Sequence, residues 1–278
     1  MSELCKTNQK DNIIIGAEPT GHYWFTLAEY LKENGIKFVF VNPMHVKRTK
    51  ELDDNHPSKN DRKDPKVIAK LVIEGRYLIP YIPEDIYAEL RVMNESRMRI
   101  NKELVAIKNR IKRWFAIYFP AYKNVFGNWE CDSSIEVLLN IPLPADAVNM
   151  GADAINQLWR AKKIRAVGIK RAKLLVEVAA NSIGVKQGVN AARCEISMLS
   201  EDFLKDKEQE QRVIEIIETL CIQVPNADKL LNIKGVGLLT VASFIGEVGD
   251  IRRFDSPKHI QKLAGFAIIE NSYGKYIG

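Results

Sequence analysis

A heptad pattern of apolar residues in the middle of the chain constrains the fold more than any other feature. From Pro83 onward, apolar side chains recur at alternating steps of three and four for four repeats, with Arg97 at the one interrupted position. This spacing places them on one stripe of a long helix, and such a stripe needs a second helix along its length. The stripe consists of Leu90, Met93, Ile100, Leu104, Ile107, Ile111, Trp114 and Tyr118.

A second and weaker stripe follows later in the chain, where Asp206 and Glu210 occupy two of its positions. Two long helices of this kind can pair as a hairpin within one chain or between two chains, and a plain helical bundle core would show the same spacing. The sequence leaves these alternatives open. The second stripe consists of Ile196, Leu199, Phe203, Val213, Ile217, Leu220 and Val224.

The N-terminal part has a different pattern. Residues 13–17 and 36–41 are short apolar runs typical of buried strands, and residues 23–34 between them have helical spacing. Further helices are predicted from about Pro43 and over 61–74. Strands that alternate with helices indicate an α/β sheet with parallel strands.

Between the two stripes, residues 151–183 are predicted to be helical and contain a basic cluster without acidic residues. The chain carries a net charge of +6 and has a pI of about 9.0, which favours a polyanionic partner. The cluster could be an ordinary solvated face, but we favour phosphate contacts, because they neutralise charge and release counterions. Its members are Arg160, Lys162, Lys163, Arg165, Lys170, Arg171 and Lys173.

Three acidic residues stand where an α/β sheet can hold a metal ion. Glu18 follows the first apolar run, and Asp61 and Asp64 lie three residues apart at the start of a predicted helix. Ligand sites lie at the carboxyl ends of parallel strands, and Mg²⁺ prefers hard oxygen ligands such as carboxylates. The alternative is that these acids only complement helix dipoles at helix N-termini.

Two C-terminal segments also carry candidate chemistry. Lys234, Gly235 and Gly237 lie in an Ile-Lys-Gly-Val-Gly turn before a helical run, and such a turn exposes backbone amides that can hold a phosphate. The turn is similar to the hairpin of helix-hairpin-helix modules, although a plain helix–helix turn uses similar glycines. Ser272 lies in a polar loop; as a nucleophile it would need an activating base or metal, and the sequence shows none nearby.

In this order and at these separations, the segments resemble the RuvC-like DEDD transposases of bacterial insertion sequences, the IS one-ten family. That family has a strand ending in G-x-E-x-T-G-x-Y, a later K-x-D-x-x-D motif, an I-x-G-(I/V)-G turn, an R-F-x-S stretch, and L-A-G-(L/F) before a serine-glycine loop. The resemblance covers nearly the whole chain. The matching residues are Gly16, Glu18, Thr20, Gly21 and Tyr23; Lys59, Asp61 and Asp64; Ile233 to Gly237; Arg253 to Ser256; Leu263 to Phe266; and Ser272 to Gly274.

The resemblance implies an α/β RuvC-like domain of the RNase H fold over residues 1–82. A long coiled-coil and helical region would occupy residues 83–224, and a small α-helical transposase domain with a helix-hairpin-helix-like turn residues 225–278. It also implies two Mg²⁺ ions held by four carboxylates, of which Glu18, Asp61 and Asp64 would be the second, third and fourth. Ser272 would be the nucleophile that forms a covalent link to DNA.

The implied activity is cleavage and rejoining of DNA strands by a transposase. The implied partners are DNA, a structured guide RNA bound by the basic helices, and a second copy of the chain bound through the coiled coil. Two rival functions stay open at this point. One is a noncatalytic remnant that only binds DNA or RNA, and the other is a RuvC-like junction nuclease that uses water as the attacking group.

The sequence departs from the family pattern at both ends. The family's first aspartate lies on an opening strand upstream, whereas only 12 residues precede Ile13 here and Asp11 does not match. We therefore expect truncation at both ends, a poorly held second metal ion and impaired strand transfer. The sequence has neither a signal peptide nor a membrane-spanning run, so we expect a cytoplasmic, nucleoid-associated bacterial protein.

Overall fold

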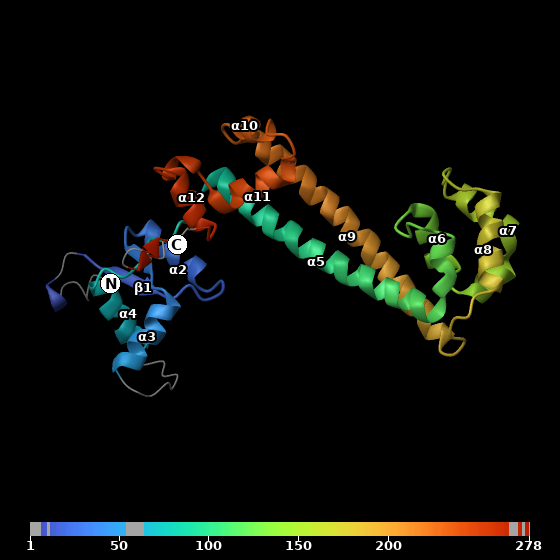
Figure 1. Ribbon diagram of the computed structural model, residues 1–278, viewed down its shortest axis with the longest axis horizontal. Coiled ribbons are helices and arrows are strands. Elements are labelled where there is room, and N and C mark those ends of the chain that lie inside the picture. The colour runs from blue at the N-terminus through green and yellow to red at the C-terminus, as the bar shows by residue number, and fades with distance from the viewer. Residues whose placement is uncertain (1–6, 10–11, 54–63, 267–271, 274–275, 278) are drawn as a thin grey trace. The chain divides into compact units, whose positions relative to one another are not determined.

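Figure 1 shows the computed structural model. It describes residues 7–9, 12–53 and 64–266, and the backbone of residues 272–273 and 276–277. The chain divides into two compact units, Met1–Ile82 and Pro83–Gly278, each with apolar clusters of its own. No helix in the described ranges combines the length and apolarity needed to cross a bilayer.

The first unit is built on a parallel pair of strands. β1 (Ile14–Ala17) pairs with β2 (Lys37–Phe40), and Ile14 lies opposite Lys37. α2 (Trp24–Glu33) connects the two strands and packs against β2, and α3 (Pro43–Asp53) and α4 (Asp64–Ile73) follow. The predicted alternation of strands and helices and the parallel pairing are thus confirmed.

A glycine allows α4 to pack closely on β1. A Cβ atom at Gly16 would lie 2.7 Å from Cγ2 of Val72 and 3.1 Å from Cγ2 of Ile68, so a larger residue would push α4 away from the strand. After α4, Leu78 forms an antiparallel bridge with Phe40, which extends the sheet by one contact. The described part of this unit is consistent with the α/β class, and the RuvC-like fold remains an expectation from the family.

Two long helices form the body of the second unit. α5 (Asp85–Tyr118) and α9 (Val189–Gln223) pack side by side within the chain (Figure 1). Most predicted stripe positions are buried in this unit, and the two helices pack against each other within the chain, while a coiled coil as such stays a prediction. The buried stripe residues are Leu90, Ile100, Leu104, Ile107, Ile111, Trp114, Ile196, Leu199, Phe203, Ile217 and Val224.

The segment between these helices contains η1 (Pro120–Asn124), α6 (Asp132–Asn140), α7 (Pro144–Ala161) and α8 (Ile169–Ala180). It packs around buried aromatic residues, and Trp114, Tyr122 and Trp159 each hydrogen-bond to a backbone carbonyl oxygen. The indole of Trp114 donates to the carbonyl oxygen of Ala192 at 2.9 Å. The indole of Trp159 donates to the carbonyl oxygen of Ser133 at 3.0 Å.

The prediction that residues 151–183 are helical is confirmed in part, because most of them lie in two separate helices. α7 ends at Ala161 and α8 begins at Ile169, with a loop between them. Lys163 has a φ of 58°, which a continuing α-helix does not allow. The guanidinium of Arg160 stabilises the loop, because it donates to the carbonyl oxygens of Ile164 at 3.3 Å and Val167 at 2.9 Å.

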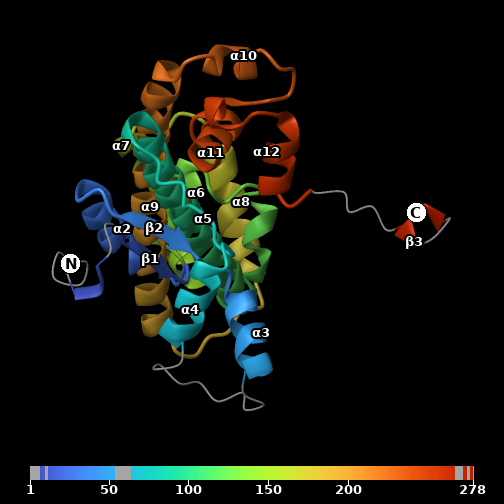
Figure 2. The ribbon, with the colours of Figure 1, turned by 90° about the vertical axis from the view of Figure 1, so that its left-hand side faces the viewer.

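The C-terminal part begins with α10 (Ala227–Leu231) and α11 (Leu238–Val248). It continues with η2 (Ile251–Arg253), α12 (Pro257–Leu263), and the antiparallel strands β3 (Ser272–Tyr273) and β4 (Tyr276–Ile277). Figure 2 shows α10, α11 and α12 at the same end of the α5–α9 pair. α11 buries Val241 and Ile245 against Leu90, Ile217 and Cys221 of the long helices. The regions 83–224 and 225–278 thus pack as one compact unit, and their division into separate domains stays a prediction.

Candidate metal site and nucleic-acid interface

Glu18 lies at the carboxyl end of β1. The strand ends at Ala17, and a tight turn follows in which the amide of Thr20 donates to the carbonyl oxygen of Glu18 at 2.8 Å. The Glu18 side chain is half-buried. Within the described residues its carboxylate has no hydrogen bond or ion pair, so the alternative that it caps α2 is not observed. The carboxylate is free to bind a ligand at this edge of the sheet.

Asp64 is the first residue of α4, the helix that packs on β1. Its carboxylate is partly buried and forms an ion pair between Oδ1 and Nζ of Lys50, from the neighbouring α3. This buried oxygen has no other hydrogen-bond partner in the described part of the chain. The Asp64 carboxylate therefore already has a positively charged partner, and a bound metal ion could take the place of that partner. Sequence reasoning missed Lys50 because no motif spacing links it to Asp64.

The two acidic residues that the structure describes, Glu18 and Asp64, carry the type of ligand atom that a hard divalent cation prefers. Glu18 and Asp64 offer carboxylate oxygens, which are the ligands that Mg²⁺ prefers. Asp61 lies outside the described residues. Among the residues that the structure describes, no three His, Cys, Asp or Glu side chains gather closely enough to hold a metal ion. The metal site that the sequence predicts thus stays a prediction.

Ser272 lies in β3, where it is paired with Ile277 of β4. The serine predicted to stand in a loop is therefore part of a short antiparallel hairpin. β3 and β4 belong to the second unit, whereas Glu18 and Asp64 belong to the first. The role of Ser272 as nucleophile remains a prediction.

The predicted basic cluster divides into two groups. Arg160, Lys162 and Arg171 have partners within the protein: Nζ of Lys162 lies 3.7 Å from Oε1 of Glu136, and Arg171 donates to the carbonyl oxygen of Val125. The other four are exposed and have no partner among the described residues, so their charge is available to a polyanion. These four are Lys163, Arg165, Lys170 and Lys173.

The glycine turn lies between α10 and α11, and its likeness to a helix-hairpin-helix turn stays a prediction. Lys234, Gly235 and Gly237 are all exposed there. Gly235 has a φ of 88°, which favours glycine, and Gly237 precedes the first turn of α11. The first amides of a helix have no intrahelical acceptor, so they can donate to an anion.

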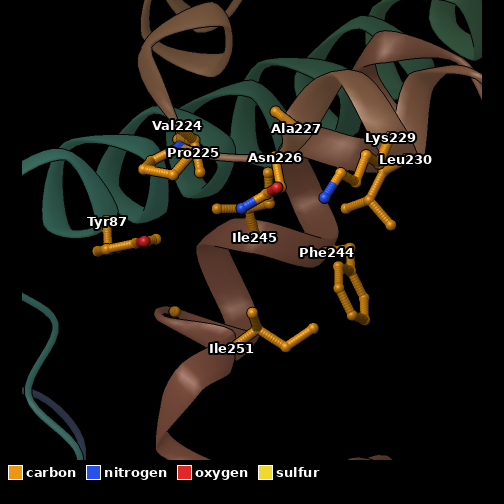
Figure 3. Close-up of a pocket in the computed structure, with 11 residues that line it drawn as sticks. Tyr87, Val224, Pro225, Asn226, Ala227, Lys229, Leu230, Phe244, Ile245 and Ile251 are labelled. Atoms are coloured by element: carbon orange, nitrogen blue, oxygen red, sulfur yellow. The ribbon is translucent and has the colours of Figure 1, made fainter.

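A pocket of about 220 Å³ lies on the same two helices. Figure 3 shows the side chains of Tyr87, Lys229, Phe244 and Ile245 around it. Its wall is mainly apolar, and Lys229 supplies a positive charge. The pocket is therefore a poor candidate for the site of phosphate chemistry.

A buried polar residue that sequence reasoning missed fixes α11 in place. The Asn94 amide donates to the carbonyl oxygens of Leu90 and Ala242, both at 2.8 Å. It also lies 3.3 Å from the hydroxyl of Ser243, which donates to its oxygen. Asn94 thereby links α5 to α11 and so supports the glycine turn that precedes α11. Its polar side chain beside an apolar stripe was the only signal in the sequence.

Two family models match the chain. A model described as "Transposase", for the DEDD domain of IS110 elements, matches residues 1–120. A model described as "Transposase IS116/IS110/IS902 family" matches residues 227–278. The first match contains the three acids predicted to bind metal, and the second contains the glycine turn and Ser272.

Two relatives from insertion elements are similar over most of the chain. The "Insertion element IS116 uncharacterized 44.8 kDa protein" of Streptomyces clavuligerus is 23% identical over 277 residues, which cover 97% of this chain and 67% of the relative. The "Insertion element IS110 uncharacterized 43.6 kDa protein" of Streptomyces coelicolor is 23% identical over 253 residues, which cover 88% and 61%. The chain thus spans about two thirds of the length of these relatives. Transposase matches at both ends, and similarity to insertion-element proteins between them, show that the chain belongs to the IS110 family of insertion-sequence transposases.

Proposed function

We propose that this chain is a DNA transposase that cleaves and rejoins DNA strands with a serine nucleophile and divalent metal ions. The observation that carries the proposal is the arrangement of the first unit. Glu18 follows the end of β1, and the helix that begins with Asp64 packs across the same strand at Gly16. The fold thus brings the elements that bear two of the predicted ligands into contact.

The proposed reaction exchanges one phosphodiester bond for another. The Ser272 hydroxyl loses its proton to a base, and its oxygen attacks a backbone phosphorus. A bond forms between phosphorus and the serine oxygen, and the bond from phosphorus to one deoxyribose oxygen breaks. The deoxyribose oxygen takes up a proton from an acid and leaves as a hydroxyl. In the second step a hydroxyl from another strand end attacks the same phosphorus and releases the serine. The number of phosphate ester bonds is unchanged, so no nucleotide cofactor is required.

In this proposal Glu18, Asp61 and Asp64 would hold Mg²⁺. When bound, Mg²⁺ would neutralise charge on the reacting phosphate oxygens. Lys50 has a positioning role, because its ion pair with Asp64 keeps the carboxylate at the start of α4. That pair supplies a positive charge to the carboxylate before any metal ion binds.

The exposed cations supply the contacts to nucleic acid in the proposal. Lys163, Arg165, Lys170 and Lys173 would contact phosphates, and the turn at 234–237 would hold a DNA backbone through its amides. We further propose a structured guide RNA and a second copy of the chain as partners, in the cytoplasm at the nucleoid. Support for these partners comes from the family alone.

The test is to trap the serine–DNA link. The protein is incubated with Mg²⁺, labelled duplex DNA from the flanks of its gene, and RNA transcribed from those flanks; the mixture is then denatured. We expect a covalent protein–DNA adduct that disappears in Ser272→Ala and in Asp64→Asn. It should persist in Ser197→Ala, a matched change on the surface of α9.

Two outcomes would overturn the proposal in different ways. Cleavage that survives Ser272→Ala would indicate a nuclease that uses water. Tight binding of nucleic acid without cleavage under any metal condition would indicate a noncatalytic binding protein.

A further inference from the structure

A pocket with aromatic walls lies in the second unit, where α5 ends and η1 begins. It has a volume of about 530 Å³. Phe115 and Tyr122 stack with their ring centres 4.5 Å apart and their planes at 13°, and the Trp129 ring lies 6.0 Å from that of Phe115. Tyr122 and Trp129 are buried, whereas Phe115 remains partly exposed. A preformed aromatic surface therefore stands open to a ligand.

The mouth of this pocket is basic. Lys112 and Lys123 line it, are exposed, and have no partner among the described residues. The lining contains no acidic side chain. The nearby carboxylate of Glu130 is neutralised by Lys108, whose Nζ lies 2.7 Å from its Oε2. The positive charge at the mouth is thus uncompensated, which suits an anionic ligand.

The pocket is also joined to the basic segment of α8. This helix packs on η1, which forms part of the pocket wall. Arg171 of α8 donates to the carbonyl oxygen of Val125, beside Phe126 in the wall. If the phosphates of a nucleic-acid strand lay along the exposed cations of α8, the aromatic pocket would lie next to that strand, on η1.

We infer that this pocket binds an unpaired nucleotide of a single-stranded nucleic acid. The base would lie against the aromatic side chains at Phe115, and Lys112 and Lys123 would contact the flanking phosphates. Aromatic side chains bind unstacked bases of either RNA or DNA, whereas bases in a duplex are already paired and stacked. Phosphate contacts alone would need no aromatic wall. The inference rests on the proposed nucleic-acid function and names an unpaired strand as the ligand of this surface.

The test uses substitutions that fill the pocket without removing its core. Ala116 is an exposed helical residue in the lining, so Ala116→Leu should narrow the pocket while α5 is preserved. A Cβ atom at Gly127 would meet no atom within 4 Å, so Gly127→Val is a second filling variant that the fold should tolerate. Ala106→Leu, at another exposed position of α5, is the matched control.

Binding is measured with labelled single strands of RNA and DNA of about 12 nucleotides and with the matching duplex. We expect both filling variants to weaken single-strand binding roughly 5- to 100-fold, the range that one base–aromatic stack supplies. Duplex binding and the control should be unchanged. Lys112→Glu with Lys123→Glu should also weaken single-strand binding and reduce its salt dependence, whereas Lys102→Glu should have little effect.

The comparison of strands identifies the ligand. A preference for RNA would identify an RNA strand, a preference for DNA a displaced DNA strand, and equal binding the shared chemistry of an unpaired base. Equal single-strand affinity of the wild type, both filling variants and Ala106→Leu would overturn the inference. The serine–DNA adduct test would still be informative after this result. Conversely, the binding comparison could still be interpreted if the adduct test failed, so the two proposals can fail independently.

Discussion

Replacement of Gly246 by alanine should destabilise the second unit, although alanine is the better helix former. Gly246 lies in α11 where this helix packs on α5, and a Cβ atom there would lie 2.8 Å from Nδ2 of Asn94 and 3.4 Å from the backbone nitrogen of Arg91. The Asn94 amide is buried and donates to the carbonyl oxygens of Leu90 and Ala242. It cannot rotate away without losing these bonds.

The magnitude follows from three opposing contributions. Overpacking of a close contact costs about 1–3 kcal/mol. Loss of the hydrogen bond from Asn94 to Ala242 adds about 1 kcal/mol. The higher helix propensity of alanine offsets about 1 kcal/mol. We therefore expect a net loss of about 1–3 kcal/mol in the free energy of unfolding, or a fall in Tm of roughly 2–12 °C for a unit of this size.

A double-mutant cycle separates the clash from other effects. In Asn94→Ala the amide is absent, so adding Gly246→Ala should cost almost nothing or stabilise the helix slightly. The coupling between the two sites should then be at least about 1 kcal/mol. Glu247→Ala, at an exposed position next to Gly246, should change stability by less than about 0.5 kcal/mol.

Urea unfolding followed by circular dichroism provides the measurement. The dependence of the unfolding free energy on urea concentration should be the same for each variant. A rise in stability for Gly246→Ala in the wild-type background would mean that helix propensity alone decides this position. Strictly additive effects of the two substitutions would equally refute the proposed contact between α5 and α11.

Two further predictions concern charged groups. Asp206 lies on α9, and burial, followed by two neighbouring carboxylates, raises the pKa of its carboxyl. The folded state therefore binds more protons than the unfolded state, so this group opposes stability above its folded pKa and ceases to do so as the pH falls to about 4. Asp206→Asn should raise the Tm near neutral pH (about 7) but not near pH 4. The exposed control Asp153→Asn should show no such gain at neutral pH, and an equal gain for Asp206→Asn at both pH values would contradict the prediction. In the first unit, Lys50→Ala removes the positive partner of Asp64, so Mg²⁺ should raise the Tm of this variant more than that of the wild type. NaCl of matched ionic strength is the control, and an equal Mg²⁺ response of both proteins would argue against a metal ligand at Asp64.

Local periodicity in the sequence predicted much of the fold. The alternation of strands and helices in the first unit follows from short apolar runs separated by helical spacing, and the two long helices follow from their stripes. The turn at Gly235 was predictable because few residues other than glycine adopt a φ of 88°. In each case the signal is a pattern within one segment of the chain, without reference to distant residues.

The sequence failed where contacts between distant residues decide the structure. The hydrogen bond from the Asn94 amide to the carbonyl oxygen of Ala242 joins α5 to α11. The ion pair of Lys50 with Asp64 joins two separate helices. No periodicity encodes such pairs, because their side chains meet only after the helices have packed.

By itself, the sequence determined which surfaces favour burial: one stripe on each long helix and the short apolar runs of the two strands. Only the tertiary structure decided what covers them, since an apolar stripe favours burial against any complementary helix, in the same chain or in another. It packed α5 against α9, placed α11 against both, and joined α11 to α5 through Asn94. It also brought Phe115 and Trp129 together beside Lys112 and Lys123, which have no partner among the described residues, because η1 and the segment after it pack against the end of α5.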